Sequence, residues 1–235
     1  RRGHQREDQW PWHDQRRALE PDHQSTASDD VDLSGMVRER EEREPAATQL
    51  RDPGPLPDEL LRMPGFVSEV MDHGLATAPY PNLVMAFCGA VALQAYLAGR
   101  KVRDPADNRT NLYLLGLAYS AAGKDSPRKL NMQIAQAVSL DGGVAERFAS
   151  GEGIQDAMGI TPTMLFQTDE IDAILQSINR AADARHEHIM STLLTLYSSA
   201  NSVYPMRRKA DQKVAQAIDQ PCLVLFGTAI PNHYY

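Results

Sequence analysis

The chain has 235 residues, of which 42% are hydrophobic and 23% are charged, and its formal net charge is -7 at pH 7. This length accommodates one substantial core, because domains commonly contain roughly 100–200 residues. The ordinary, mildly acidic composition excludes a strongly basic nucleic-acid binder, so any contact with DNA must come from a local patch.

Residues 1 to 57 are dominated by Arg, Glu, Asp, Gln, His and Pro, as in "EREEREP" and "RDPGPLP". So few large apolar side chains cannot offset the entropy of ordering the backbone, and we expect a disordered charged linker. The chain begins without Met or an apolar signal sequence, and it ends shortly after an expected strand. We therefore expect a piece of a longer protein.

Residues 58 to 104 predict a helical lead-in, with a short amphipathic helix, a Pro-Gly break and a second helix. The nearly uncharged run 82–99 approaches the roughly 20 residues that a bilayer requires. Much of it is Ala and Gly, however, and Gln94 lies inside it. We expect a buried core helix and no membrane partner.

The two cysteines, Cys88 and Cys222, lie far apart in separate apolar runs. This spacing matches neither a metal site nor a disulfide framework. Buried, reduced thiols in the cytoplasm are the expectation.

Residues 105 to 235 alternate expected strands and helices, which predicts an α/β fold built as a three-layer parallel sheet. The apolar run 111–118 predicts a strand buried on both faces, as in the centre of such a sheet. A helix is expected at 126–140, with Pro127 in its first turn. The remaining expected elements are a helix that Ser150 caps, a strand at 161–168, helices at 171–181 and 184–199, and a strand at 221–229.

The segment "AYSAAGKDS", residues 118–126, lies between the first strand and its helix and resembles the phosphate-binding pattern G-x-x-x-x-G-K-[ST]. Ala118 replaces the first glycine, and Asp125 replaces the hydroxyl residue that binds magnesium, so its carboxylate repels phosphate unless a cation lies between them. Ser126 is one alternative source of the hydroxyl and a candidate metal ligand; the other alternative is that Asp125 holds the metal through water. We predict that nucleotide contacts come from Ala118, Ser120, Ala122, Gly123, Lys124, Asp125 and Ser126, with Gly123 permitting close approach and Lys124 reaching the β- and γ-phosphates.

An acidic pair, Asp169 and Glu170, follows the strand expected at 161–168. Nucleotide hydrolysis needs one carboxylate to anchor Mg²⁺ and a neighbour to orient and deprotonate water. Asp169 suits the first role and Glu170 the second, with Lys124 as the catalytic cation. The alternative is that the pair only caps the following helix; a loop and carboxylates in this order favour an ATPase.

Other polar residues near the C-terminus are weaker site candidates. Thr228 is a candidate sensor of the γ-phosphate, or else part of a strand-ending turn, and Asn232 is a further site candidate. Arg207 and Arg208 are candidates for an arginine finger on a neighbouring subunit or for contacts with nucleic-acid phosphates. An exposed basic turn without a role is the alternative for this pair.

A family resemblance rests on six segments in chain order: "PGFVSEV", "LAGRKV", "NLYLLGLAYSAAGKDSPRK", "ASGEGIQDAM", "LFQTDEID" and "LFGTAIPNHYY". Together they resemble an uncharacterised P-loop ATPase family of phages, plasmids and integrated elements. The resemblance covers roughly residues 58 to 235. It implies a RecA-like helicase core that is incomplete at its C-terminus, with ATP and Mg²⁺ as cofactors, DNA as a partner and assembly into a homo-oligomeric ring. It also implies a primase-type or zinc-binding domain upstream. By position, Lys124 is the phosphate lysine, Asp169 the metal ligand and Glu170 the base.

We therefore expect a Mg-ATP-hydrolysing module of a mobile-element DNA replication protein, a primase–helicase or replicative helicase. The alternative is a degenerate P-loop domain that binds nucleic acid or protein without hydrolysis, owing to Ala118 and Asp125. A small-molecule phosphotransferase would need a lid of arginines after the second strand, and no such cluster precedes Arg207.

Overall fold

The computed structural model describes residues 54, 56–148, 150–172, 175, 184–208 and 216–231. The chain divides into two compact units, Arg1–Pro53 and Gly54–Tyr235. Every described residue belongs to the second unit, so nearly all of the expected linker, residues 1–57, lies outside the described residues. Asn232 also lies outside them.

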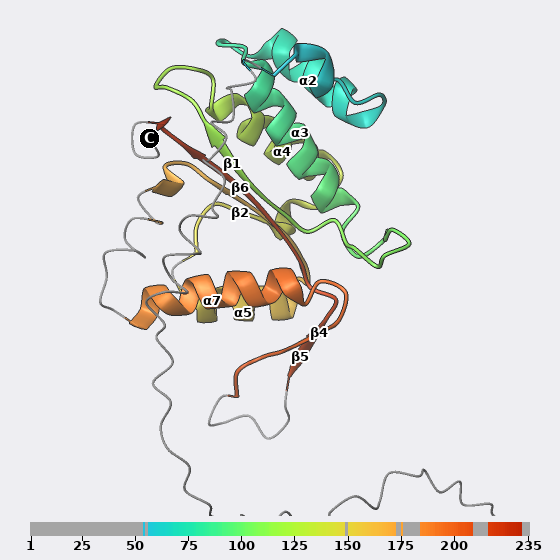
Figure 1. Ribbon diagram of the computed structural model, residues 1–235, viewed down its shortest axis with the longest axis vertical. Helices are drawn as coiled ribbons and strands as arrows, with labels where there is room; N and C mark the ends of the chain where they lie inside the picture. Colours follow the sequence, from blue (N-terminus) through green and yellow to red (C-terminus); the bar gives the residue numbers. More distant parts are fainter. Residues whose placement is uncertain are drawn as a thin grey trace, which may run out of the picture. The chain divides into compact units, whose positions relative to one another are not determined.

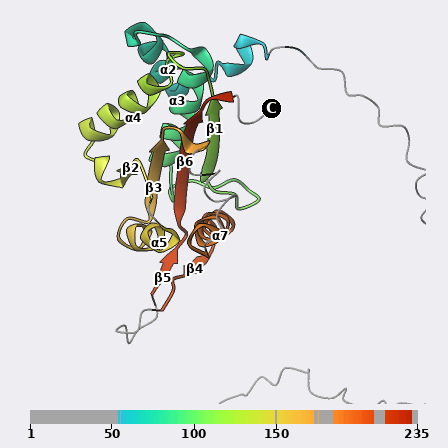
Figure 2. The same cartoon turned by 90° about the vertical axis from the view of Figure 1, so that its left-hand side faces the viewer.

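Four parallel strands form the main sheet of the second unit (Figures 1 and 2). They are β1 (Leu112–Leu117), β2 (Val144–Ala145), β3 (Thr163–Thr168) and β6 (Cys222–Ala229), in the order β1-β6-β3-β2. The α/β class is thus confirmed. Because all four strands run the same way, the segments that follow β1, β3 and β6 emerge at one edge of the sheet.

The central strand is β6, and all eight of its residues are buried. Its unbroken apolar run suits a strand that is covered on both faces. The prediction that the run 111–118 is central and buried on both faces is wrong, because β1 lies at the edge of the described sheet and Leu115 is 42% exposed. Local sequence did not reveal that the last strand of the chain would take the central place.

Helices cover both faces of the sheet (Figure 1). On one face, α2 (Phe66–Thr77), α3 (Leu83–Leu97) and α4 (Asp125–Ala137) pack with Leu165, Val224 and Phe226. On the other face, α5 (Gly151–Ile160) and α7 (Ala184–Ser198) pack with Met164, Leu223 and Leu225. Successive residues of β3 and β6 therefore contribute to opposite cores, as the alternation of side chains along a strand requires.

The helical lead-in starts with a 3-10 turn, Asp58–Leu61, and continues through α2 and α3. Helix α3 is the core helix expected at 82–99, and its N-terminus is capped by Asn82. Its neighbour α4 approaches closely, because a Cβ at Gly89 would lie 2.5 Å from the Cβ of Pro127. Among the described residues no helix has the length and apolar character needed to cross a membrane.

Several predicted details are confirmed and several short elements were missed. Pro127 lies in the first turn of α4, and the Ser150 hydroxyl accepts a hydrogen bond from the Gly153 N–H at the start of α5. Of the helix expected at 171–181, only residues 171, 172 and 175 are described, and they are helical. The sequence did not predict β2, the 3-10 turn Asp141–Gly143, or the antiparallel pair β4 (Val203–Pro205) and β5 (Ala217–Asp219).

Both cysteines are free thiols, and Cys222 is buried whereas Cys88 is partly buried. Burial raises the pKa of each thiol above its ordinary value. These thiols are therefore protonated and poorly reactive at neutral pH.

Candidate functional site

A cleft of about 490 Å³ lies at the edge of the sheet where the strands have their carboxyl ends. This volume falls in the range of small-molecule sites, about 300–1,000 Å³. Its walls come from the loop after β1, the linker between α2 and α3, and the residues that follow β3 and β6. The structure brings together seven of the predicted site residues in this lining: Ser120, Gly123, Lys124, Asp125, Ser126, Asp169 and Glu170.

Gly123 has a backbone conformation that strongly favours glycine, with φ of 79°. A Cβ at this position would overlap the main-chain oxygen of Tyr80, in the linker between α2 and α3. The glycine is therefore required for the linker to pass directly over the loop. Sequence reasoning assigned Gly123 to the approach of phosphate and did not foresee this contact within the chain.

Asn82 attaches the lead-in helices to the loop. Its side-chain oxygen accepts a hydrogen bond from the Met85 N–H at 3.0 Å, which caps α3, and its amide nitrogen donates to the carbonyl of Ala122 at 3.0 Å. One side chain thus fixes both the start of α3 and the shape of the loop.

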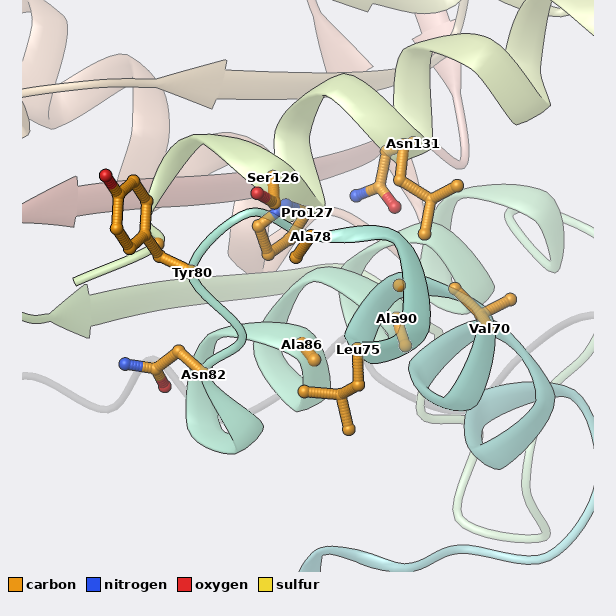
Figure 3. A pocket seen from close by; sticks show the side chains of 13 residues that line it. Val70, Leu75, Ala78, Tyr80, Asn82, Ala86, Ala90, Ser126, Pro127 and Asn131 are labelled. Atoms are coloured by element: carbon orange, nitrogen blue, oxygen red, sulfur yellow. The ribbon is translucent and has the colours of Figure 1, made fainter. Parts of the chain in front are cut away.

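The same linker borders a narrow apolar pocket between α2, α3 and α4 (Figure 3). Side chains such as Val70, Leu75 and Ala90 line it, and its volume of about 20 Å³ is close to that of a single water site. This pocket is a packing feature that is too small for a nucleotide.

Asp169 is held by three donors at the end of β3. Its Oδ1 accepts hydrogen bonds from the Thr228 hydroxyl at 2.8 Å and the Glu170 N–H at 3.0 Å, while Nη2 of Arg128 lies 3.2 Å from Oδ2. Burial raises the pKa of Asp169, but the Thr228 hydrogen bond, the Arg128 charge, the Glu170 N–H and the Lys124 charge together outweigh it. The net pKa lies below the ordinary value, so the carboxylate is ionised at neutral pH.

Arg128 joins two of the three carboxylates that line the cleft, Asp125 and Asp169. Its Nη2 lies 2.6 Å from Oδ1 of Asp125 as well as 3.2 Å from Asp169, and its side chain is only 15% exposed. The positive guanidinium offsets the negative charge of Asp125, which stands where the phosphate-binding pattern has a hydroxyl. Sequence reasoning missed Arg128, although its position one helical turn after Lys124 was a usable signal.

Two buried amides connect α4 to the carboxylate strand. Asn131 donates to the side-chain oxygen of Gln167 at 2.9 Å, and Gln167 donates to the carbonyl of Arg128 at 3.2 Å. The helix that follows the loop and the strand that carries Asp169 are thereby held in a fixed relation.

Glu170 also lines the cleft, and its φ of 50° lies in the left-handed region. For a residue with a Cβ this conformation costs about 1–2 kcal/mol, and such backbone strain is concentrated at functional sites. The strained turn directs the chain away from β3 immediately after Asp169.

The other candidate residues lie outside the described cleft lining. The N–H of Ala118 donates to the carbonyl of Ala229 at 3.0 Å and so extends the pairing of β1 with β6. Ala122 is held by Asn82, and Thr228 is fully buried against Asp169. These residues hold the loop and Asp169 in place without lining the cleft.

The basic pair lies apart from this cleft. Arg207 forms ion pairs with Asp156 at 3.3 Å and Glu152 at 3.9 Å, both on α5, whereas Arg208 is exposed. Within one chain, the guanidinium of Arg207 is therefore engaged by acidic side chains.

The described residues contain no group of three or more His, Cys, Asp or Glu side chains that is arranged to hold a metal ion. Mg²⁺ in nucleotide sites commonly uses one or two carboxylates together with substrate phosphates. Asp169, in its ionised state beside Asp125 and Ser126, fits that pattern and does not fit a metal site built from protein ligands alone. No protein-family model matches this chain, and no curated protein matches it in sequence.

Proposed function

We propose that the chain binds a Mg²⁺-nucleoside triphosphate, ATP in the first instance, in the cleft at the carboxyl edge of the sheet and hydrolyses it. The observation that carries the proposal is the convergence of Lys124 and Asp169. The two residues line one cleft, and the lysine charge helps to lower the pKa of the carboxyl group. A cation and an ionised carboxylate that line one cleft suit a triphosphate that is bound together with Mg²⁺.

Each residue has a distinct role in this proposal. The loop around Gly123 and the first turn of α4 offer N–H groups to phosphate oxygens, and Lys124 binds the β- and γ-phosphates. Asp169 binds the cation, kept ionised and oriented by Thr228, and Ser126 supplies a hydroxyl ligand. Glu170 orients the attacking water and accepts its proton. When bound, the cation neutralises charge that develops on the transferred phosphoryl group.

The strand order also supports a RecA-like P-loop ATPase. β6, which carries Thr228, lies between the strand that leads into the loop and β3, the strand that Asp169 follows. The wider proposal is an ATPase module of a mobile-element replication protein of the primase–helicase or replicative helicase type. DNA as partner and a homo-oligomeric ring rest on the resemblance of the motifs to the P-loop ATPase family.

The test is binding of Mg-ATP to the full chain and to Lys124→Ala, measured by calorimetry, followed by phosphate release with and without single-stranded DNA. We expect Lys124→Ala to lose binding and release, because it removes the cation that the loop itself places in the cleft; Lys129, which also lines the cleft, lies further along on α4. Lys101→Ala, which removes an exposed lysine at the other end of α3, is the control and should bind like the wild type. Unchanged ATP affinity in Lys124→Ala would refute the proposed site.

A second candidate function is nucleotide or macromolecule binding without hydrolysis. Two observations favour it: Asp125 stands at the hydroxyl position, and both oxygens of Asp169 already have partners. The same experiment separates the candidates, because tight Mg-ATP binding without phosphate release, with or without DNA, would support the non-hydrolysing module.

A further inference from the structure

Tyr80 presents an exposed aromatic ring at the candidate nucleotide cleft. Its side chain is 64% exposed, and it lines the same cleft as Lys124. Tyr119, within the loop itself, is equally exposed at 65% but does not belong to the described lining of the cleft. Of these two exposed tyrosines, Tyr80 is the one that lines the cleft together with Lys124.

The backbone around Tyr80 is held rigidly. Pro79 and Pro81 flank it, and each proline fixes its own φ and restricts the residue before it. The Tyr80 carbonyl lies against Gly123, and the adjacent Asn82 donates to Ala122 in the loop. The backbone that carries the ring is therefore held near the loop before any ligand binds, which lowers the entropic cost of a contact with Tyr80.

The chemistry of this wall suits a planar, apolar group. Tyr80 and Pro79 come from the linker, and Ile230 follows β6, so apolar surface adjoins a lining that also contains Lys124 and Asp169. A nucleotide has this combination of parts, with a flat base joined through a ribose to anionic phosphates. Aromatic side chains stack on bases of any sequence because every base has a π face.

We infer that Tyr80 stacks on the base of the nucleotide whose phosphates are bound by Lys124. The inference rests on the proposed function and assigns the base subsite of that same cleft. Because a ring face contacts the plane of the base and not its hydrogen-bonding edge, the contact serves ATP and GTP alike.

The test compares ATP, GTP and inorganic tripolyphosphate, each with Mg²⁺, by calorimetry on the full chain. Tyr80→Ala weakens the affinity for ATP and GTP by about tenfold and leaves that for tripolyphosphate unchanged. Tyr80→Trp restores binding of both nucleotides. Tyr197→Ala, which removes an exposed tyrosine on α7, is the matched control and leaves all three affinities unchanged.

Four outcomes would overturn this assignment. Equal weakening for tripolyphosphate and ATP would show that Tyr80 only supports the loop. Unchanged ATP affinity, with loss of single-stranded DNA binding in its place, would assign the ring to DNA. If the wild-type chain binds tripolyphosphate as tightly as ATP, the base adds no affinity, and the stacking alone is refuted. If the wild-type chain binds neither tripolyphosphate nor a nucleotide, the proposed function is refuted as well.

Discussion

Asp125 carries the charge that makes this loop unusual, and Arg128 provides its partner. The two residues are three apart at the start of α4, so their side chains meet on one face of the helix. Arg128 also reaches Asp169 on the neighbouring strand. A loop that has an aspartate after its lysine therefore carries a compensating cation one turn later, and the guanidinium links the loop to the carboxylate strand.

Removing this cation should change the acid titration of Asp169. The folded-state pKa of Asp169 lies below the ordinary value of 3.8, so the ionised carboxylate adds to stability above that value. This contribution is lost as the pH falls through the lower folded pKa. In Arg128→Ala one of the lowering influences is absent, and we expect the Asp169 pKa to rise and the acid-side loss of stability to begin at higher pH.

The measurement is the carboxyl titration of Asp169 by NMR, together with urea unfolding between pH 2 and pH 7. Arg103→Ala, at an exposed ion pair with Asp107, is the control and should leave the titration of Asp169 unchanged. A titration of Asp169 that is identical in Arg128→Ala and the wild type would contradict the assigned ion pair.

Gly123→Ala tests the contact between the linker and the loop. An added Cβ would meet the Tyr80 carbonyl at a backbone conformation that disfavours side chains, so the loop or the linker must move. We expect a loss of unfolding free energy of more than about 1 kcal/mol, together with loss of ATP binding. The matched control is Gly142→Ala, where nothing lies within 4 Å of the added Cβ. Equal stability of the two variants would contradict the close contact.

Local sequence patterns predicted some of the residues that line the cleft and did not predict others. Lys124 and Asp169 were predicted because each follows an apolar strand in a recognisable turn. Tyr80 and Asn82 were not predicted, since they reach the loop only when the lead-in helices fold back over it from about forty positions earlier in the chain.

Among the elements, α3 and α4 form the contact that positions the loop. Gly89 of α3 faces Pro127 in the first turn of α4, directly after the residues that line the cleft. A small residue on one helix and a rigid ring on the other allow the two backbones to come close. The position of the turn that carries Gly123 and Lys124 thus depends on the packing of a helix that belongs to the lead-in.

Gly89→Ala should therefore destabilise the protein even though alanine favours helices. The gain in helix propensity is at most about 1 kcal/mol, whereas overpacking a rigid contact costs about 1–3 kcal/mol. We expect a net loss of stability and weaker ATP binding, measured by thermal unfolding and calorimetry. Gly153→Ala in α5, where the added Cβ meets only Ser150 Oγ at an ordinary 3.5 Å, should instead be neutral or stabilising. Stabilisation by Gly89→Ala would contradict the packing.

The sequence predicted the longer helices and strands, because their apolar residues recur at regular spacing over many positions. The helices α3, α4 and α7 and the strands β1, β3 and β6 were all expected close to their observed positions. The missed strands β2, β4 and β5 have only two or three residues each. Such short segments are defined by their pairing, β2 with β3 and β4 with β5, and are too short to show a periodic pattern of their own.

For the whole molecule, the proposed ligand should act as a stabiliser. A ligand that binds only the folded state adds about 2.7 kcal/mol of stability at one hundred times its dissociation constant. We expect saturating Mg-ATP to raise the Tm of the wild type by several degrees and to leave that of Lys124→Ala unchanged, measured by differential scanning calorimetry. A Tm increase of equal size in the two proteins would indicate that the nucleotide binds elsewhere.

The layered α/β architecture was predicted from the alternation of strands and helices, because each helix covers the strand beside it. The strand order was not predicted. It depends on β6 pairing with both β1 and β3, and no local sequence pattern indicates which strands pair. The position of β1 at the edge follows from the same order.

The central place of β6 has a consequence for biosynthesis. During translation, β1 leaves the ribosome long before β6, so the pairing of the two strands, for example of Leu112 with Val224, forms only after β6 has been synthesised. A nascent chain that ends before β6 therefore exposes the apolar edges of β1 and β3 and has no assembled cleft. Such late, long-range closure is slow and prone to aggregation, so chaperones that shield unpaired strands should raise the yield of folded protein.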